Sequence, residues 1–589
     1  MPSVLILDGC PLTRECLSML LRAEGFKVLA VPDSAQAKAQ LSKRAPDLLL
    51  CELVAPDGST LGLLRSIKQD KRLSKMRTCV LTNIAAKTPL TQAVEAGVSA
   101  LMLKSRFSFK ALVRQLNELA EKATKKDGTE KPAEESRRYP LPVPAPDQSL
   151  ELRQLKPMIT RPELEKALEE HPRMYASEQA VAFLRSILES DDCKMESLAN
   201  AIQGDPGLMA RLYREANSKE DGCEEPANSV FEALLRVGLD RLVAILDEVS
   251  AEEPTSKARA DAPVTHDQLR AHALAVGVIA SKIASHCQGI DPRWAMTCGL
   301  LHDVGRVRML GALGDKLTTT LDISSQLGVP MHAGEKRLLL VEHDKLGMMM
   351  TNTWNLPREV TQVIGYHHEE QVKLGTVCSA APKLAACVAL GDHLAHALGY
   401  GNSGSTTLEA CETLFDMLEN DDLTLDAIVD GLKAQIDEAF EQSGVSTDLL
   451  CEGVQHPVPD QALLPAFISA NPQTDIFGLW LRQSFGELGA DQTPNMAVVH
   501  LRQIKDRNEL SDALTALQQR LGEQGVHDPL PVMILSPTGR YGLLDDVMTR
   551  HPCIHLRTPF GMSMFERTVN ALFSGQQQVA PVSATRMAA

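Results

Sequence analysis

Short apolar runs alternate with amphipathic stretches at the amino-terminal end of the chain. The apolar runs lie at residues 4–7, 28–31, 48–53, 79–82 and 100–103. Runs of this length are typical of strands buried on both faces, and the stretches between them, such as 11–24 and 34–43, have helical spacing. Strands that alternate with helices predict a doubly wound α/β domain over residues 1–122, with its site at the carboxyl ends of the strands.

In the middle of the chain, the apolar residues recur with the spacing of an α-helix instead. Apolar stripes with helical spacing run through residues 174–189, 194–202, 205–218, 229–246, 268–283, 338–350, 360–368 and 383–398. Asp205 and Pro206 favour the N-cap and first turn of one helix, and Gly238 is expected to break another. We therefore expect an all-α domain over residues 149–456. A charged and then proline-rich segment, 123–148, is expected to be the linker before it.

Strand-like and helix-like patterns alternate again after a proline-containing break at residues 455–459. The strand-like runs are 465–470, 496–501, 532–535 and 554–556, and helical stretches lie at 509–521 and 564–572. These patterns predict a second α/β domain over residues 461–575. The polar residues 576–589 are expected to be a disordered tail. The chain is thus predicted to be multidomain, with an all-α domain between two α/β domains.

Composition and charge narrow the class of protein. Apolar residues make up 44% of the chain and charged residues 23%, as in ordinary globular proteins. The formal net charge of −16 argues against a nucleic-acid partner, which would need a basic surface. The 13 cysteines are scattered, as reduced thiols in a cytosol are, and no apolar run is long enough to span a bilayer. We expect a soluble, cytoplasmic protein.

Several histidines and aspartates fall on or beside the apolar faces of the predicted central helices. They are His272, His302, Asp303, His343, His367, His368 and Asp392. Taken singly, an inward histidine or aspartate is more often a hydrogen-bonded core residue than a ligand. Burying all of them without partners would cost roughly 1–3 kcal/mol each, so a shared metal or a shared hydrogen-bond network is expected. Imidazole suits a transition metal, and a carboxylate can bridge two ions.

The strand ends of the first domain resemble those of a response-regulator receiver domain. Asp8 ends the first strand, Glu52 stands at the phosphoacceptor position, Thr82 matches the switch hydroxyl and Lys104 matches the phosphate-pairing lysine. The family carries an aspartate where Glu52 stands and a second acidic residue where Gly9 stands. Magnesium binding is therefore not expected. Two interpretations stay open: a pseudo-receiver held in one state for docking, or a receiver-like scaffold without a switching role.

The order of the central histidines and aspartates resembles the HD superfamily of metal-dependent phosphohydrolases, and within it the HDOD domain. Supporting motifs are Asp205-Pro206, the run from Gly299 to Gly305, and Trp354-Asn355-Leu356-Pro357. The resemblance implies an all-α fold used in bacterial signalling. It also implies one or two divalent iron, manganese or zinc ions, held by the seven central residues, with Asp303 as the bridging ligand and candidate catalytic residue.

Two departures weigh against catalysis. No Gly-Tyr-Pro signature follows His367 and His368, unlike in the relatives that hydrolyse cyclic dinucleotides. The lysine of those enzymes is replaced by Arg306, whose guanidinium is a poor proton donor. We therefore interpret this domain as a non-catalytic scaffold, adaptor or ligand-sensing module. The alternative is a metal-dependent phosphohydrolase acting on cyclic dinucleotides or nucleotides.

The last domain is similar to a second, degenerate receiver. Ser536-Pro537 and Pro559-Phe560 match its last two signatures. Asn471 stands where the acidic pair would begin, His500 or Leu501 falls near the acceptor position, and Thr558 replaces the lysine. A generic α/β interaction module is the other interpretation. The expected partners of the whole chain are other signalling proteins, with a nucleotide as a candidate ligand and with oligomerisation left open.

We predict that acetyl phosphate does not phosphorylate Glu52. Its carboxylate is one methylene longer than that of an aspartate, and Gly9 supplies no ligand for the magnesium ion that the reaction requires. Mass spectrometry of the treated protein should show no acyl phosphate at this residue. Detecting one there would contradict the prediction.

Overall fold

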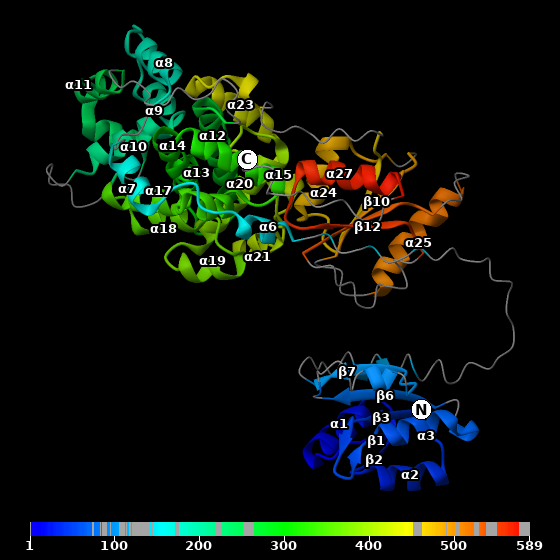
Figure 1. Cartoon of the computed structure of the whole chain (residues 1–589). Coiled ribbons are helices and arrows are strands. Elements are labelled where there is room, and N and C mark those ends of the chain that lie inside the picture. Colours follow the sequence, from blue (N-terminus) through cyan, green and yellow to red (C-terminus); the bar gives the residue numbers. More distant parts are fainter. Residues whose placement is uncertain are drawn as a thin grey trace. The chain divides into compact units, whose positions relative to one another are not determined.

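The protein forms two compact units, Met1–Glu135 and Ser136–Ala589, in a computed structural model (Figure 1). The structure describes residues 2–73, 76–82, 91–94, 96–104, 147–170, 176–218, 229–250, 264–450, 462–489, 492–501, 507–523, 529–537 and 550–575, with a few single positions between them. Most of the predicted linker and the whole predicted tail, 576–589, lie outside the described residues. Each unit is described by itself.

The amino-terminal unit is built on a five-stranded parallel sheet. Its strand order is β2-β1-β3-β6-β7, one of the two common orders of doubly wound folds. The bounds are β1 (Ser3–Leu7), β2 (Lys27–Val31), β3 (Leu48–Cys51), β6 (Arg77–Thr82) and β7 (Ala100–Leu103), with α1 (Pro11–Ala23), α2 (Ser34–Lys43) and α3 (Leu61–Gln69). Every strand that the apolar runs predict is therefore present.

Both faces of this sheet are buried, which explains why its strands are continuously apolar. Val4 and Ile6 of β1 face one core with Leu21 of α1, whereas Leu5 and Leu7 face another core with helices α2 and α3. Because neighbouring side chains of a strand point to opposite faces, only a strand covered by helices on both sides can bury such a run.

The second unit begins with a large helical region. Its helices are α6 (Gln148–Gln154), α7 (Arg161–Glu170), α8 (Glu178–Leu188), α9 (Met195–Gln203), α10 (Pro206–Ala216), α11 (Val230–Ser250), α12 (His266–Ser285), α13 (Pro292–Leu301), α14 (Val304–Leu313), α15 (Asp315–Leu327), α16 (Met331–Gly334), α17 (His343–Thr353), α18 (Arg358–Tyr366), α19 (Gln371–Val377), α20 (Pro382–Leu398), α21 (Glu412–Leu418), α22 (Leu425–Val429) and α23 (Leu432–Ser443). Helices α12, α13 and α20 pack against one another at its centre.

Local sequence signals account for several of these helix ends. Asp205 caps α10, accepting a hydrogen bond from the Leu208 amide, and Pro206 occupies its first turn as predicted. Thr265 and Gln268 form a capping box at the start of α12. Gly238, at φ 76°, interrupts α11 where the sequence predicts a break.

The predicted helix over residues 338–350 is wrong in its first part. Residues Glu335–Leu339 form a π-helical turn, Leu340 is left-handed at φ 63°, and α17 starts only at His343. The cause is the buried carboxylate of Glu335, which accepts a hydrogen bond from the His343 amide at 2.9 Å. This contact supplies an acceptor for the first turn of α17 and fixes the position of His343.

Glycines let the central helices approach closely. A Cβ on Gly299 of α13 would lie 2.6 Å from Gly277 Cα of α12. A Cβ on Gly305 of α14 would lie 1.9 Å from the carbonyl oxygen of His343 and 2.8 Å from the Gly347 nitrogen of α17. These contacts bring together the helix ends that carry the candidate site residues.

The carboxyl-terminal part of this unit contains a parallel sheet in the order β12-β11-β10-β9. The elements are β9 (Pro465–Ile468), α24 (Ile476–Phe485), β10 (Met496–His500), α25 (Arg507–Glu523), β11 (Val532–Ser536), β12 (Cys553–Arg557), β13 (Phe560–Gly561) and α27 (Met562–Phe573). One face shares a core with the helical region, through α24, α27 and the clustered rings of Phe477, Trp480, Phe560 and Phe565. Strand β13 also pairs antiparallel with β8 (Thr407–Leu408) of the helical region.

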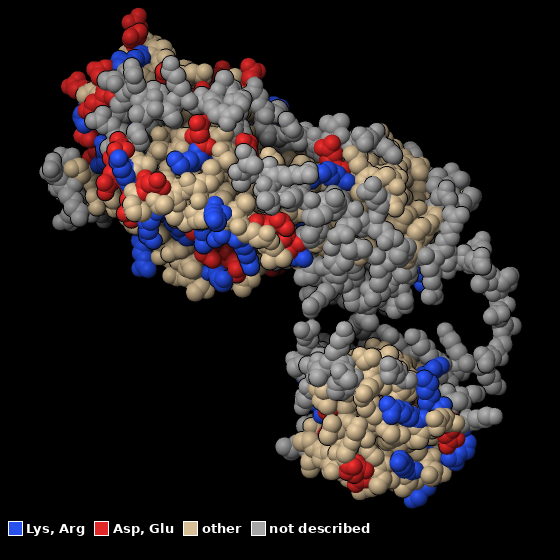
Figure 2. Space-filling view, in the orientation of Figure 1, with Lys and Arg blue, Asp and Glu red and all other residues tan. Residues whose placement is uncertain are grey.

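Acidic and basic side chains are interspersed over the described helices on the face shown in Figure 2. Within the described residues, no helix has the length and apolar character needed to cross a membrane.

We predict that Gly305→Ala lowers the free energy of unfolding of the second unit by about 1–3 kcal/mol or more, because the added Cβ overlaps backbone atoms of α17. Gly522→Ala in α25 is the matched control, since a Cβ there meets no atom within 4 Å; it should be neutral or stabilise by about 0.5–1 kcal/mol. Urea unfolding followed by circular dichroism measures both. Equal effects of the two substitutions would contradict the proposed close packing.

Candidate functional site

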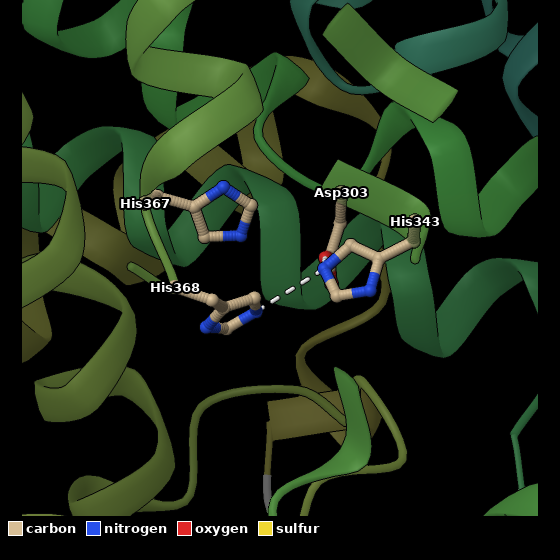
Figure 3. Close-up of side chains that lie close together, drawn as sticks. All are labelled: Asp303, His343, His367 and His368. Carbon is tan, nitrogen blue, oxygen red and sulfur yellow. Dashed lines mark hydrogen bonds and ion pairs between the residues drawn. The ribbon is translucent and has the colours of Figure 1, made fainter. Parts of the chain in front are cut away.

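The histidines and aspartates singled out from the sequence meet inside the helical region. His272 comes from α12, Asp392 from α20, His302 and Asp303 from the junction of α13 and α14, His343 from the start of α17, and His367 and His368 from the end of α18. Figure 3 shows Asp303, His343, His367 and His368 pointing toward one another. All of these residues are buried except His368, which is partly exposed.

Backbone carbonyls orient three of these imidazoles. The Nδ1 atom of His302 lies 2.7 Å from the Gly299 oxygen, that of His367 lies 2.8 Å from the Ile364 oxygen, and that of His272 lies 3.3 Å from the Tyr400 oxygen. A carbonyl oxygen accepts a hydrogen bond from Nδ1–H, so the unprotonated Nε2 atom faces the pocket. Among the described atoms, Nε2 of His302 and Nε2 of His367 have no hydrogen-bond partner. Metal-ligating histidines are held in this way.

Asp392 lies on one side of the cluster, which we call the α20 side. Its Oδ1 atom is 3.0 Å from His272 Nε2, 3.6 Å from His302 Nε2 and 3.4 Å from His396 Nδ1. Burial would raise the pKa of Asp392, but the neighbouring imidazoles of His396, His272 and His302 hold it well below its usual value. This side therefore offers a carboxylate surrounded by imidazoles.

The opposite side, which we call the α17 side, contains an internal cation. Arg306 Nη1 lies 2.6 Å from Asp303 Oδ2, and its Nε lies 3.3 Å from Glu335 Oε1. Its Nη2 lies 2.9 and 3.1 Å from the two ring nitrogens of His343. The guanidinium is 2% exposed, so a permanent charge is buried among the predicted metal ligands.

His343 is held by carboxylates from both flanks. Its Nδ1 lies 2.5 Å from Glu335 Oε2 and its Nε2 lies 2.9 Å from Asp303 Oδ1. Burial and Arg306 would lower the pKa of His343, but Glu335 and Asp303 raise it to about 9. By contrast, burial lowers the pKa of His367 to about 3, so that ring is neutral at neutral pH.

Two residues of the site were not predicted from the sequence. Glu335 lies in a π-helical turn that the predicted helix did not include. It is followed directly by Lys336 and Arg337, so its sequence neighbours gave no sign that it is buried. His396 lies one turn after Asp392 on the same face of α20, so the four-residue spacing from Asp392 could have revealed it.

A partly open pocket reaches the cluster and is lined by Arg306, His368 and Asp392, with Thr407 of β8.

The predicted pocket of the amino-terminal sheet also forms. Lys104 follows β7, and its Nζ lies 2.6 Å from Asp8 Oδ2 and 2.8 Å from Glu52 Oε2. Burial would lower the pKa of Lys104, but the bonds with Asp8 and Glu52 outweigh it and raise the pKa. Thr82, which ends β6, is buried, and its hydroxyl oxygen accepts a hydrogen bond from the Ile84 amide at 3.1 Å.

Comparison with known proteins identifies two domains. Residues 4–117 match the model of the response regulator receiver domain, and residues 175–370 match the model of the HDOD domain. The chain joins a receiver domain to an HDOD domain. These two matches confirm the predicted resemblance to signal-transduction proteins of the response-regulator class.

The relatives match parts of the chain. An uncharacterized protein of Treponema pallidum is 27% identical over 187 residues, and the transcriptional regulatory protein PhoB of Pseudomonas aeruginosa is 29% identical over 114 residues. These matches cover 36% and 49% of the two relatives, so the chain spans half or less of their length. The crystal structure of the MmoQ response regulator from Methylococcus capsulatus is 22% identical, covering 47% of this chain and 95% of that chain with a TM-score of 0.34.

The residues singled out in the last sheet lie apart from the HDOD pocket. Asn471 is exposed in the turn after β9, and Thr558 is buried after β12. His500 ends β10 and is fully buried, 2.7 Å from Asp475, a residue that the sequence did not single out.

We predict that Lys104→Met lowers the free energy of unfolding of the receiver domain by roughly 1–3 kcal/mol, because Asp8 and Glu52 lose the cation that lies between them. Arg72→Met removes an exposed ion pair with Asp70 and should cause no measurable change. Thermal unfolding of both variants tests the difference. A Lys104 variant as stable as the wild type would show that this contact contributes nothing.

Proposed function

We propose that the HDOD domain works as a non-catalytic scaffold or ligand-sensing module in a signalling pathway. The observation that carries this proposal is Arg306, whose guanidinium contacts Asp303 and His343, the residues that would hold an ion on the α17 side. A divalent cation there would have to displace a buried positive charge that Asp303 and Glu335 already neutralise. An arrangement for two adjacent metal ions is therefore disfavoured.

A single divalent ion fits the α20 side. His272, His302, Asp303 and Asp392 would hold it, and the orphaned Nε2 of His302 supports this set. Two histidines with two carboxylates suit iron, manganese or zinc better than magnesium. Such an ion would supply positive charge to attract a phosphate or nucleotide ligand, and the chain's own Arg306 lines the same pocket.

A metal-dependent phosphohydrolase is the second candidate. The observation that favours it is the unpartnered Nε2 of His367, which lies with Asp303, His343 and His368 close enough to share an ion. In this case the α17 side would also accept a metal, and Asp303 would contact both ions. The substrate class would be cyclic dinucleotides or nucleotides.

The receiver domain is proposed to act by docking rather than by phosphorylation. Lys104 is already paired with both Asp8 and Glu52, so the carboxylate of Glu52 supplies a permanent negative charge at the acceptor position. Other signalling proteins of the cytoplasm are its proposed partners.

We also infer that residues 462–575 are a degenerate receiver, supported by a parallel sheet whose strands run consecutively from β9 to β12. That is the receiver order without its second strand.

We predict that Arg306→Met opens the α17 side to a second divalent ion. Removing the guanidinium takes a permanent positive charge away from Asp303 and Glu335. This loss should lower the free energy of unfolding by about 3–5 kcal/mol in chelator, and manganese should restore part of it. Arg270→Met is the matched control, because Arg270 is equally buried and paired with Asp205 and Asp267 outside the pocket.

The control variant should be destabilised without any gain from manganese. Metal analysis and thermal unfolding measure both effects. If manganese stabilises the two variants equally, the internal-cation proposal is wrong.

Assays of cyclic dinucleotides and nucleotides with added manganese separate the two candidate functions. The scaffold proposal expects at most one bound ion in the wild type and no turnover. Turnover by the wild type that disappears in Asp303→Ala would establish the phosphohydrolase instead.

A further inference from the structure

A second group of metal-type donors lies outside the HDOD pocket, at the carboxyl edge of the last sheet. Asp475 is the N-cap of α24, His500 ends β10, and Glu412 begins α21 of the helical region (Figure 1). Asp475 and His500 are 0% exposed and Glu412 is 8% exposed. Three segments that are distant in sequence thus bury three ionisable side chains at one point.

The distances allow these donors to share one ion. His500 Nδ1 lies 2.7 Å from Asp475 Oδ2 and 3.5 Å from Glu412 Oε1. One ligand atom from each residue lies within 4.8 Å of the other two. Ligands of a tetrahedral ion at about 2.0–2.2 Å lie about 3.3–3.6 Å apart, so small side-chain rotations suffice.

The surroundings hold the donors in place. The Ser469 hydroxyl donates to Asp475 Oδ2 at 2.6 Å, and the Phe477 amide donates to Asp475 Oδ1 at 3.1 Å. The Phe477 ring packs edge-on against His500, with centroids 4.9 Å apart. Hydrogen bonds to a ligating carboxylate and an apolar wall beside an imidazole are features that orient metal ligands.

Negative charge is concentrated at this point. Two carboxylates lie within reach of one imidazole nitrogen. Like charges brought together in an apolar interior are costly unless a cation or a proton offsets them. Imidazole nitrogen with two carboxylate oxygens selects a zinc-type divalent ion over calcium or magnesium.

We propose that a zinc-type divalent metal ion binds between Glu412, Asp475 and His500 and links helix α21 to the carboxyl-terminal sheet. None of its ligands belongs to the HDOD pocket, so the site is independent of the function proposed above. Its role is structural, because it joins two segments of one compact unit and is shielded from solvent. The competing arrangement is a metal-free network in which His500 donates to Asp475.

Zinc binding to full-length variants tests the site. Glu412→Gln and Asp475→Asn keep the side-chain shape and remove one ligand each. After chelation and reloading, both are expected to hold one zinc equivalent fewer than the wild type, or to bind it at least tenfold more weakly. His555→Gln is the matched control, because His555 is a buried histidine of the same sheet that bonds to Ser536 and Ala145. It should keep the wild-type zinc content.

Any zinc held by the HDOD pocket is the same in the wild type and in the variants, so it cancels when the zinc content of a variant is subtracted from that of the wild type. Equal zinc content and affinity in the wild type and in both ligand variants would overturn the proposal in favour of the metal-free network.

A measurement on the wild type keeps the test valid if the variants do not fold. Crystals grown with zinc should show an anomalous peak at the zinc edge between the three side chains. Zinc-loaded crystals without a peak at this position would also overturn the proposal. Neither result bears on the role of Arg306 in the other pocket.

Discussion

The buried ion pairs of Arg306 determine how the HDOD pocket is built. One guanidinium contacts Asp303 at the start of α14, Glu335 in the π-helical turn and His343 at the start of α17. Each of these groups would be costly to bury alone, and together they largely neutralise one another. The same contacts explain the interrupted helix before His343, because Glu335 must turn inward to meet both the guanidinium and the first amide of α17.

The receiver domain and the HDOD domain share one electrostatic feature. In each, a basic side chain of the protein occupies the middle of an acidic pocket: Lys104 between Asp8 and Glu52, and Arg306 between Asp303 and Glu335. The related enzymes and switches place a metal ion or a phosphoryl group among such carboxylates. Here the protein's own lysine and arginine neutralise these carboxylates, which supports a role in binding partners rather than in group transfer.

The sequence predicts those parts of the fold that depend on local periodicity. The strands of both sheets and the inward faces of His272, His367 and Asp392 follow from apolar spacing, because the hydrophobic neighbours of a residue determine which side of an element is buried. The sequence did not predict the position of Glu335, because a π-helical turn and the left-handed backbone of Leu340 bring it into the pocket. The pairing of Asp475 with His500 depends on segments that meet only after the sheet has formed.

The short pairing of β8 with β13 joins the wall of the HDOD pocket to the last sheet. Leu408 pairs with Phe560, whose ring lies in the aromatic cluster with Trp480, and Thr407 lines the pocket on the other side of the same strand. The helical region and the last sheet therefore belong to one compact unit, Ser136–Ala589. Excision of the helical segment at its sequence borders would expose an unpaired strand edge and an aromatic surface, so modularity in the sequence does not mean autonomy in folding.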